Sequence, residues 1–272
     1  MAEISIEGRR VFYFECGSGA PIVLLHAGAG SGKQWTKIAR LLEPRFRVIA
    51  PDLWGFGGTE SWAGEPELTH DHQASLVADV IQHLCQAPVH LVGHSYGGAT
   101  AVRLMLRNRD LVQSTVLIEP ILPSLLESAG ETRLFREYLE MAQSFLRNAA
   151  AGDLDEAWRG FLDYRNGPGT WEALPDAPRE RFRAATESTV AGFRSNLSNP
   201  TSLKDLDGLS VSTLVMCGDK TTVPDRRVTE ILRDHIPQCR YERIPGAEHM
   251  SPLSHPEFIA EAIERHVQQR RP

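Results

Sequence analysis

The segment Gly93-His94-Ser95-Tyr96-Gly97 holds the residues of this chain best suited to nucleophilic chemistry. A serine between small residues can occupy a tight strand-to-helix turn, which lifts its hydroxyl above a sheet. The context fits, because residues 89–92 have an apolar strand pattern and residues 99–106 a helical one. The N-terminus of that helix favours negative charge beside the serine. We therefore predict that Ser95 is a nucleophile and that the Tyr96 amide helps to hold an oxyanion.

Together with this turn, three further segments resemble the α/β-hydrolase superfamily, in particular its small bacterial serine esterase-like members. They are His26-Ala27-Gly28, Ala50-Pro51-Asp52-Leu53-Trp54-Gly55-Phe56-Gly57 and Ile244-Pro245-Gly246-Ala247-Glu248-His249. The resemblance covers nearly the whole chain outside residues 122–199. It implies that His249 is the general base that takes the serine proton. It also implies that the Gly28 amide joins that of Tyr96 in an oxyanion hole, although Ala27 replaces the family's usual glycine.

The acid that should orient the base is where the sequence departs from the family pattern. The family usually carries an aspartate three residues after the glycine that ends the penultimate strand. That glycine is Gly218 here, and Thr221 occupies the acid position. Two carboxylates remain as candidates, Glu119 at the end of an earlier strand and Asp219. We favour Glu119, whose extra methylene helps it reach the imidazole, and keep Asp219 as the alternative; either would fix the tautomer and stabilise the imidazolium.

The elements that must position these residues alternate between strands and helices. Strands are expected at residues 4–6, 11–15, 21–26, 47–52, 89–94, 114–119, 213–217 and 240–244, and helices at 33–43, 70–85, 96–108, 226–235 and 256–269. This alternation predicts an α/β-hydrolase fold, with a mostly parallel eight-stranded sheet and helices on both faces. Residues 122–199 show only helices and loops, which indicates a helical cap inserted after the sixth strand. Residues 1–121 and 200–272 then form the core domain, and ligands bind at the strand ends under the cap.

Composition limits the classes of partner. A net charge of −6 with well-mixed charges argues against a nucleic-acid binder. The four cysteines show no C-x-x-C spacing, so neither a disulfide framework nor a zinc site is expected. The N-terminus lacks the apolar region of a signal peptide, and no apolar stretch is long enough to cross a bilayer. We expect a soluble cytoplasmic protein, a monomer or homodimer, with no metal or organic cofactor.

These observations predict a serine hydrolase that cleaves a carboxylic ester or lactone of a small, largely apolar substrate through an acyl-enzyme. Trp54 and Val223 are predicted to border the substrate. Carbon–carbon hydrolysis or perhydrolysis on the same triad, and a non-catalytic small-ligand receptor of this fold, are the alternatives. A nucleotide-binding loop at residues 28–33 is disfavoured, because Ala27 and Gln34 break the G-x-x-x-x-G-K-[ST] pattern at both ends.

Overall fold

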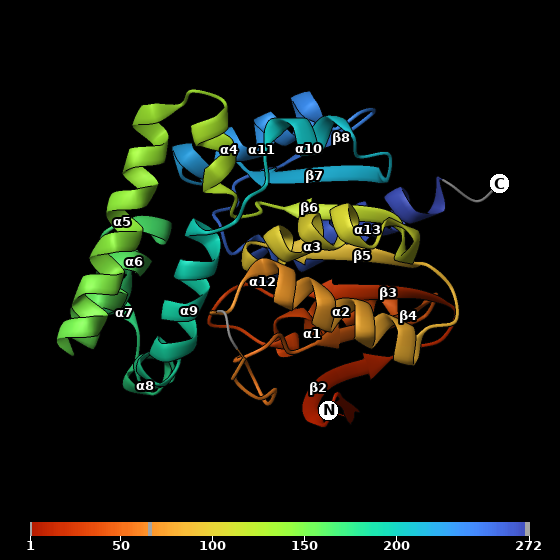
Figure 1. The fold of residues 1–272 in the computed structure, drawn as a ribbon, viewed down its shortest axis with the longest axis horizontal. Coiled ribbons are helices and arrows are strands. Elements are labelled where there is room, and N and C mark those ends of the chain that lie inside the picture. The colour runs from red at the N-terminus through yellow and green to blue at the C-terminus, as the bar shows by residue number, and fades with distance from the viewer. Residues whose placement is uncertain (1, 65–66, 270–272) are drawn as a thin grey trace.

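The computed structural model describes residues 2–64 and 67–269 (Figure 1). Eight strands form one sheet in the order β1-β2-β4-β3-β5-β6-β7-β8. The strands are β1 (Ala2–Ile6), β2 (Arg9–Cys16), β3 (Ala20–Leu25), β4 (Phe46–Pro51), β5 (Val89–His94), β6 (Val112–Ile118), β7 (Ser212–Gly218) and β8 (Arg240–Ile244). Only the pairs that involve β2 are antiparallel. The predicted mostly parallel eight-stranded sheet is confirmed. Residues 1, 65–66 and 270–272 of the predicted core domain lie outside the described residues.

Helices cover both faces of the sheet, because the strands are apolar on both sides. α1 (Thr36–Leu42) and α13 (Pro256–Gln268) share one core cluster with Ile22 and Leu24 of β3. The other face carries α2 (His70–Leu84), α3 (Tyr96–Arg107) and α11 (Val223–His235), which share a second cluster with Val23 and Leu25. Alternate residues of one strand therefore enter opposite cores. Shorter elements complete this part: η1 (Gly32–Trp35), η2 (Arg109–Leu111), α10 (Leu203–Asp207) and α12 (Ser251–Ser254).

Seven helices lie between β6 and β7 in the sequence, with α10 as the last of them. The first six stand beside the carboxyl ends of the strands (Figure 1). They are α4 (Pro123–Ser128), α5 (Thr132–Ala151), α6 (Leu154–Asn166), α7 (Thr170–Ala173), α8 (Asp176–Ala184) and α9 (Thr186–Leu197). We call residues 123–197 the helical insertion. It has an aromatic core of its own, in which Phe145, Trp158 and Trp171 are buried. The rings of Phe145 and Trp158 pack edge to face with centroids 5.1 Å apart.

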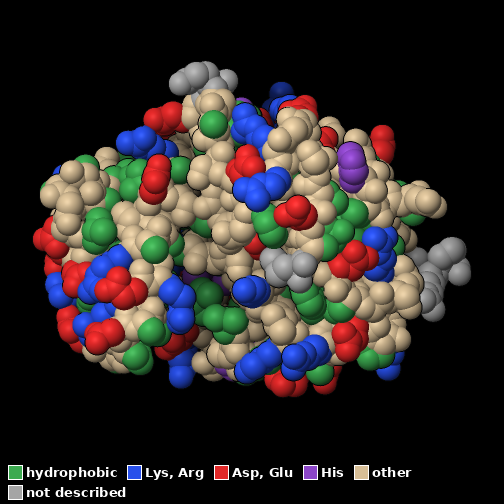
Figure 2. Space-filling view, turned by 90° about the horizontal axis from the view of Figure 1, so that it is seen from below, with side chains coloured by type: hydrophobic (Ala, Val, Ile, Leu, Met, Phe, Trp, Pro, Cys, Tyr) green, Lys and Arg blue, Asp and Glu red, His purple; other side chains and the backbone are tan. Residues whose placement is uncertain are grey.

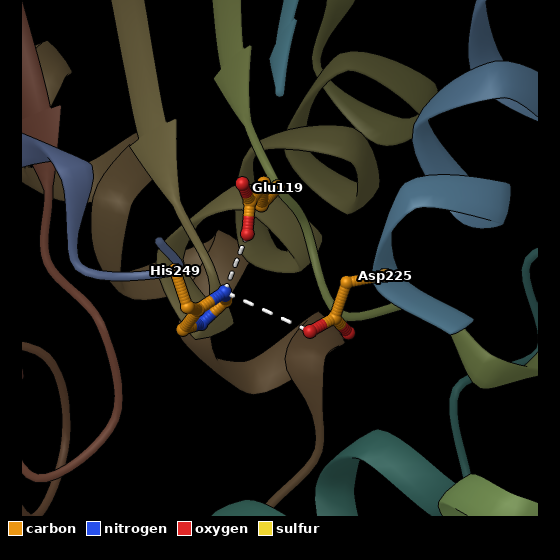
Figure 3. A group of neighbouring side chains, drawn as sticks. All are labelled: Glu119, Asp225 and His249. Carbon is orange, nitrogen blue, oxygen red and sulfur yellow. Dashed lines mark hydrogen bonds and ion pairs between the residues drawn. The ribbon is translucent and has the colours of Figure 1, made fainter. Parts of the chain in front are cut away.

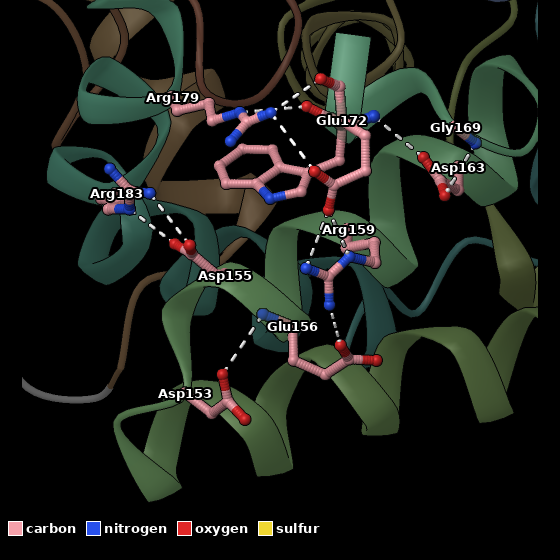
Figure 4. Close-up of polar contacts among 10 residues, drawn as sticks. Asp153, Asp155, Glu156, Arg159, Asp163, Gly169, Glu172, Arg179 and Arg183 are labelled. Atoms are coloured by element: carbon pink, nitrogen blue, oxygen red, sulfur yellow. Dashed lines mark hydrogen bonds and ion pairs between the residues drawn. The ribbon is translucent and has the colours of Figure 1, made fainter. Parts of the chain in front are cut away.

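Ion pairs join three helices on the outer side of the insertion (Figure 4). Arg159 of α6 pairs with Glu172 of α7 at 2.9 Å, and Asp155 of α6 pairs with Arg183 of α8 at 2.5 Å. The guanidinium of Arg183 also lies over the Trp171 ring, 5.7 Å from its centroid. Exposed ion pairs individually contribute little to stability. This network therefore helps to orient three helices whose packing the aromatic core already determines.

Two predicted helix starts differ from the structure for local reasons. The helix expected from residue 33 begins as the 3-10 turn η1, and α1 follows only at Thr36. The helix expected from residue 226 begins three residues earlier, because Thr222 is its N-cap and accepts a hydrogen bond from the Asp225 amide. Pro224 fits the first turn, where no amide hydrogen bond is needed. Over the described residues, no helix has both the length and the apolar character that a bilayer crossing requires.

Candidate active site

Ser95 occupies the turn between β5 and α3 with a left-handed backbone, φ 54°. This conformation is strained for a residue with a side chain and persists only where the surroundings enforce it. A Cβ on Gly93 would lie 2.5 Å from the Gly97 carbonyl oxygen, and one on Gly97 would lie 2.5 Å from that of Leu25. The Ser95 amide donates to the Ile118 carbonyl at 3.0 Å. The close backbone packing therefore requires the two glycines and fixes the serine above the sheet.

His249 follows β8 and brings its imidazole to this serine. Its Nε2 lies 2.9 Å from Ser95 Oγ. Its backbone carbonyl accepts a hydrogen bond from His94 Nε2 at 2.9 Å, and the Gln34 amide nitrogen donates to His94 Nδ1 at 3.1 Å. This pattern requires neutral His94 with its proton on Nε2. Burial lowers the pKa of His94 well below its ordinary value, which agrees with a neutral ring that supports the His249 loop.

Glu119 reaches the other nitrogen of the same imidazole. It directly follows β6, is fully buried, and has φ 43°. Its Oε2 lies 2.7 Å from His249 Nδ1, as Figure 3 shows. The Gly218 amide donates to Oε1 at 2.7 Å, and the Thr221 hydroxyl donates to Oε2 at 2.6 Å. These donors orient the carboxylate and compensate for its burial.

The alternative acid, Asp219, lies on the surface instead. Its side chain is 43% exposed and pairs with Arg243 at 2.8 Å. The Gly246 amide donates to the same carboxylate at 3.3 Å. The hydrogen bond from Arg243 lowers the pKa of Asp219. Of the two predicted carboxylates, the structure thus brings Glu119 to His249 and turns Asp219 toward β8.

The two amides predicted for the oxyanion hole belong to neighbouring residues. A Cβ on Gly28 would touch the Tyr96 Cβ at 3.8 Å, and both residues line one cavity with Ser95. The Ala27 amide is already used, because it donates to Gln34 Oε1 at 3.1 Å. The backbone around Gly28 is therefore held by a side chain, and the roles of the Gly28 and Tyr96 amides stay predictions.

A cavity of about 950 Å³ lies between the sheet and the helical insertion, and Ser95 and His249 form part of its wall. Figure 2 shows a hollow between the two parts of the molecule, with hydrophobic and histidine side chains inside it. Aromatic and aliphatic side chains line much of the cavity, among them Phe56, Ile121, Phe161, Phe182 and Phe193. Such a lining suits a small, largely apolar ligand.

Every charged side chain that lines this cavity, histidine aside, is a cation. The three are Lys33, Arg165 and Arg181, and none of the described lining residues is an aspartate or glutamate. Lys33 and Arg181 are exposed, whereas Arg165 is buried. Within the described part of the chain, neither Lys33 nor Arg181 takes part in an ion pair. The cavity is thus cationic at its charged positions although the chain as a whole carries −6.

The structure does not bring the two predicted substrate contacts, Trp54 and Val223, to this cavity. The Trp54 amide donates to Gln73 of α2, and its indole packs beside that of Trp62 with ring centroids 6.2 Å apart. It lines an adjoining hollow with Trp62, and this hollow shares Gly55, Ala184 and Ser188 with the cavity. Val223 is the first residue of α11 and is 52% exposed, whereas Pro224 and Asp225 in the same turn are buried. Neither residue is among those that line the cavity, because helix contacts and a helix start decide where these side chains lie.

A buried ion pair beside the imidazole escaped the sequence analysis. Arg165 of α6 pairs with Asp225 of α11, and the two side chains are 5% and 4% exposed. Asp225 Oδ2 lies 3.8 Å from His249 Nδ1. The one local signal was Thr222 three residues before Asp225, a spacing typical of a helix N-terminus. Nothing local to Arg165 predicted its burial.

The surroundings of His249 favour a neutral imidazole. Its pKa is lowered, first because burial removes the imidazolium from water and second because of the Arg165 charge. The Glu119 carboxylate acts in the opposite direction. Burial also lowers the pKa of Arg165. A neutral base next to a serine hydroxyl is the state that general-base chemistry requires.

Glu119, Asp225 and His249 also offer ligand atoms within 4.8 Å of one another, a spacing compatible with a metal ion. The contacts already made do not suit one. Asp225 pairs with the Arg165 guanidinium, and His249 Nδ1 is engaged by Glu119. A metal cation would have to displace a cation from Asp225 and a hydrogen bond from His249.

Comparisons with known proteins identify the family of the chain. The family model described as alpha/beta hydrolase fold matches residues 20–256, so the chain belongs to the α/β-hydrolase family. A non-heme haloperoxidase of Rhodococcus erythropolis is 28% identical over 89% of this chain and 90% of its own length. A soluble epoxide hydrolase of Corynebacterium sp. (strain C12) is 36% identical, but the match spans 47% of this chain and only 43% of that protein. A thermophilic esterase from Thermogutta terrifontis has 25% identity and a TM-score of 0.76, with 99% of each chain covered.

Proposed function

We propose that this protein is a cofactor-independent serine hydrolase that cleaves a carboxylic ester or lactone of a small, largely apolar substrate. One observation carries the proposal: Ser95, His249 and Glu119 form a continuous hydrogen-bonded chain at the wall of the cavity, with lengths of 2.9 and 2.7 Å. A nucleophile, a base and an orienting acid in this order define a triad by geometry, whatever the sequence positions.

The proposed reaction has two steps. His249 Nε2 takes the Ser95 proton while Oγ attacks the ester carbonyl, and the amides of Gly28 and Tyr96 hold the oxyanion. The imidazolium, stabilised by Glu119, then gives its proton to the leaving alcohol. In the second step His249 activates a water molecule, which releases the acid from Ser95. The amide donors contribute strongly, since loss of one such donor typically costs ~10²–10³ in rate.

Hydrolysis of p-nitrophenyl acetate and butyrate tests the proposal. Wild type should be active, Ser95→Ala inactive, and Glu119→Gln reduced by ~10³–10⁴, by analogy with loss of the acid in other triads. The matched control is Asp219→Asn, which removes a carboxylate from the surface and should keep wild-type activity. Loss of activity in Asp219→Asn with retention in Glu119→Gln would contradict the assignment of the acid.

Covalent labelling separates catalysis from simple binding. An alkyl phosphonate ester should add to Ser95 of wild type, seen as a mass increase of the intact protein, and should not add to Ser95→Ala. A receptor of the same fold without a working triad would bind small apolar molecules and remain unlabelled. An inert and unlabelled wild type would therefore overturn the hydrolase proposal in favour of the receptor.

A second candidate is perhydrolysis, in which hydrogen peroxide takes the place of water as acceptor of the acyl group and yields a peracid. The similarity to a non-heme haloperoxidase over most of both chains favours a test of this activity. Peracetic acid formation from acetate and peroxide, lost in Ser95→Ala, is the expected result if perhydrolysis is physiological. Carbon–carbon hydrolysis would use the same triad. Epoxide hydrolysis is disfavoured, because Ser95 stands where those enzymes use a carboxylate nucleophile.

A further inference from the structure

The buried pair of Arg165 and Asp225 joins the helical insertion to the core beside the proposed catalytic base. Arg165 comes from α6 of the insertion, and Asp225 lies in the first turn of α11. The Thr222 hydroxyl donates to Asp225 Oδ2 at 2.8 Å, which fixes this carboxylate. Arg165 donates to the same oxygen through one terminal nitrogen, while its buried Nε has no hydrogen-bond partner. The pair therefore costs desolvation that its own contacts do not fully compensate.

The position of Asp225 gives His249 a second carboxylate. Figure 3 shows Glu119 and Asp225 approaching the same ring nitrogen from different elements. Glu119 Oε2 lies 2.7 Å from His249 Nδ1 and accepts its hydrogen bond. Asp225 Oδ2 lies 3.8 Å from that nitrogen, too far for a hydrogen bond but close enough for a strong charge interaction. Two unpaired carboxylates at these distances would favour a protonated imidazole, which is unable to act as a base.

Arg165 opposes that effect. The charged and titratable groups around His249 are Glu119 at the end of β6, Asp225 in α11, Arg165 in α6 and His94 in β5. His94 is neutral, so the balance lies between two carboxylates and one guanidinium. Since Arg165 is bonded to Asp225, the guanidinium cancels the second carboxylate and leaves Glu119 as the single net charge acting on the ring.

We propose that Arg165 and Asp225 form a positioning pair that sets the protonation equilibrium of His249, with Arg165 keeping the base neutral at neutral pH. When the imidazolium forms during turnover, Glu119 stabilises it, because Arg165 offsets the charge of Asp225. The inference rests on the proposed function for its kinetic test, because turnover depends on the protonation of His249. The effect of the two charges on this imidazole requires no substrate, so the titration of His249 can also be measured directly.

The pair makes opposite predictions for its two members. Arg165→Met leaves the Asp225 carboxylate uncompensated, and His249 should then titrate about 1 pH unit or more higher. Asp225→Asn leaves the guanidinium uncompensated, and His249 should titrate lower by a similar amount. The double variant removes both charges and should return His249 to within about half a unit of wild type. Purely structural damage would not give two shifts of opposite sign that cancel in the double variant.

Two measurements follow the titration. The first is the acidic limb of the pH profile of kcat/KM for p-nitrophenyl butyrate, which reports the base in the free enzyme. The second is NMR of protein labelled at histidine, with the His249 signal assigned by its absence in His249→Gln. Arg183→Met and Asp155→Asn are the matched controls, because this partly exposed Arg–Asp pair joins two helices of the insertion and contacts neither His249 nor Glu119, so it should shift neither readout.

Shifts of the same sign in Arg165→Met and Asp225→Asn, or no shift in either, would overturn the inference. If Arg165→Met folds and its pH profile of kcat/KM is shifted, Arg165→Lys, which keeps the positive charge, should restore the acidic limb of the wild-type profile. If Arg165→Met does not fold, Asp225→Asn decides alone, and an unchanged or raised titration of His249 contradicts the proposal. An inactive wild type would defeat the proposed function, whereas the NMR titration would still test the pair.

Discussion

Thr221 donates its hydroxyl to Glu119 Oε2 across 2.6 Å, although Thr221 stands at the loop position where the family resemblance implies a triad aspartate. The carboxylate that contacts His249 thus stands at the end of β6, and the loop after β7 supplies a donor to it. The Gly218 amide, at the end of β7, donates to the other oxygen. The loops after β6 and β7 thus act as one site, so a triad acid can be tested in the loop after β7.

Relocation of the acid tests this reciprocal arrangement. Glu119→Ala should lose ~10³–10⁴ in kcat/KM, and Glu119→Ala/Thr221→Asp should recover at least about tenfold of that loss, because Asp at position 221 would face the space that the glutamate vacates. Esterase assays on the four proteins provide the measurement. Thr221→Asp alone is the control: two adjacent carboxylates would share a proton, and activity should fall. A double variant no better than Glu119→Ala would show that the loop cannot carry the acid.

The hydrogen bond itself has a smaller expected effect. Thr221→Val preserves the shape of the side chain and removes the donor to Glu119. Hydrogen bonds to charged groups contribute about 1.5–3 kcal/mol, so we expect a loss of about tenfold or somewhat more in kcat/KM. Thr221→Ser keeps a hydroxyl and should stay near wild type. Equal activity in the valine and serine variants would mean that Gly218 alone orients the carboxylate.

The sequence predicted those features that follow from position along a strand. The turn at Ser95 and the place of Glu119 after β6 were both predictable, because residues directly after parallel strands meet at one edge of the sheet. The alternation of elements likewise predicted the eight strands and the helical segment after the sixth. Features that depend on contacts between distant elements were not predictable. Trp54 turns toward Trp62, and Val223 points into solvent at a helix start.

The pair of Arg165 and Asp225 illustrates the same limit more sharply. Sixty positions separate the two residues in the chain. Each taken alone looks like an ordinary charged residue of a helix, and only the placement of α6 against α11 reveals that both are buried. Charged side chains are usually exposed, so the sequence favoured the opposite interpretation. The nucleophile of such a site can be predicted from the local sequence. The charges around it can be assigned only from a structure, because they come from both the insertion and the core.

Two glycines of helices should respond to alanine in opposite ways. A Cβ on Gly97 would lie 2.5 Å from the Leu25 carbonyl oxygen and 2.6 Å from that of His26, both of them backbone atoms. Gly97→Ala must push the start of α3 away from the oxyanion loop, and we expect a loss of about 2–3 kcal/mol in the free energy of unfolding, or no folding at all. Urea unfolding measures the change.

Gly160 is the matched control for this prediction. It lies within α6, and a Cβ there would meet nothing within 4 Å. Since alanine is the better helix former, Gly160→Ala should raise the free energy of unfolding by roughly 0.5–1 kcal/mol. The same substitution thus separates backbone crowding from helix propensity. A Gly97→Ala protein as stable as wild type would show that α3 can shift freely, which contradicts the fixed geometry of the turn.

Acid should destabilise the fold through its buried histidines. Burial lowers the pKa of His70 and of His90 to about 4, against an ordinary value of 6.5. Below pH 6.5 the unfolded chain binds protons that the native protein does not, so this stability is complete above 6.5 and is lost as the pH falls toward 4. The slope is up to about 1.4 kcal/mol per pH unit for each such histidine. Urea midpoints measured from pH 7.5 to 4.5 provide the check.

Single variants connect that slope to particular side chains. His90 Nδ1 lies 2.8 Å from Ser114 Oγ in the core of the sheet, so His90→Gln should reduce the slope although it lowers stability at pH 7.5. His83 is exposed on α2, and His83→Gln should leave both the slope and the stability unchanged. A slope that is the same in the His90 and His83 variants would locate the acid sensitivity elsewhere, for example in the carboxylates.

The cationic lining of the cavity should discriminate against cationic esters. Butyrylcholine and its uncharged isostere, 3,3-dimethylbutyl butyrate, present the same shape and the same scissile bond to Ser95. With Lys33 and Arg181 as the exposed charged lining, and Arg165 offset by Asp225, the choline ester should have a kcat/KM about tenfold lower, which corresponds to roughly 1.4 kcal/mol of repulsion. Added salt should narrow this difference in kcat/KM, because Lys33 and Arg181 are exposed and therefore screened. The double variant Lys33→Gln/Arg181→Gln should reduce the difference in kcat/KM between the two esters at low salt, as added salt does for wild type. Faster hydrolysis of the choline ester than of its isostere would show that the reacting alcohol group does not pass these cations.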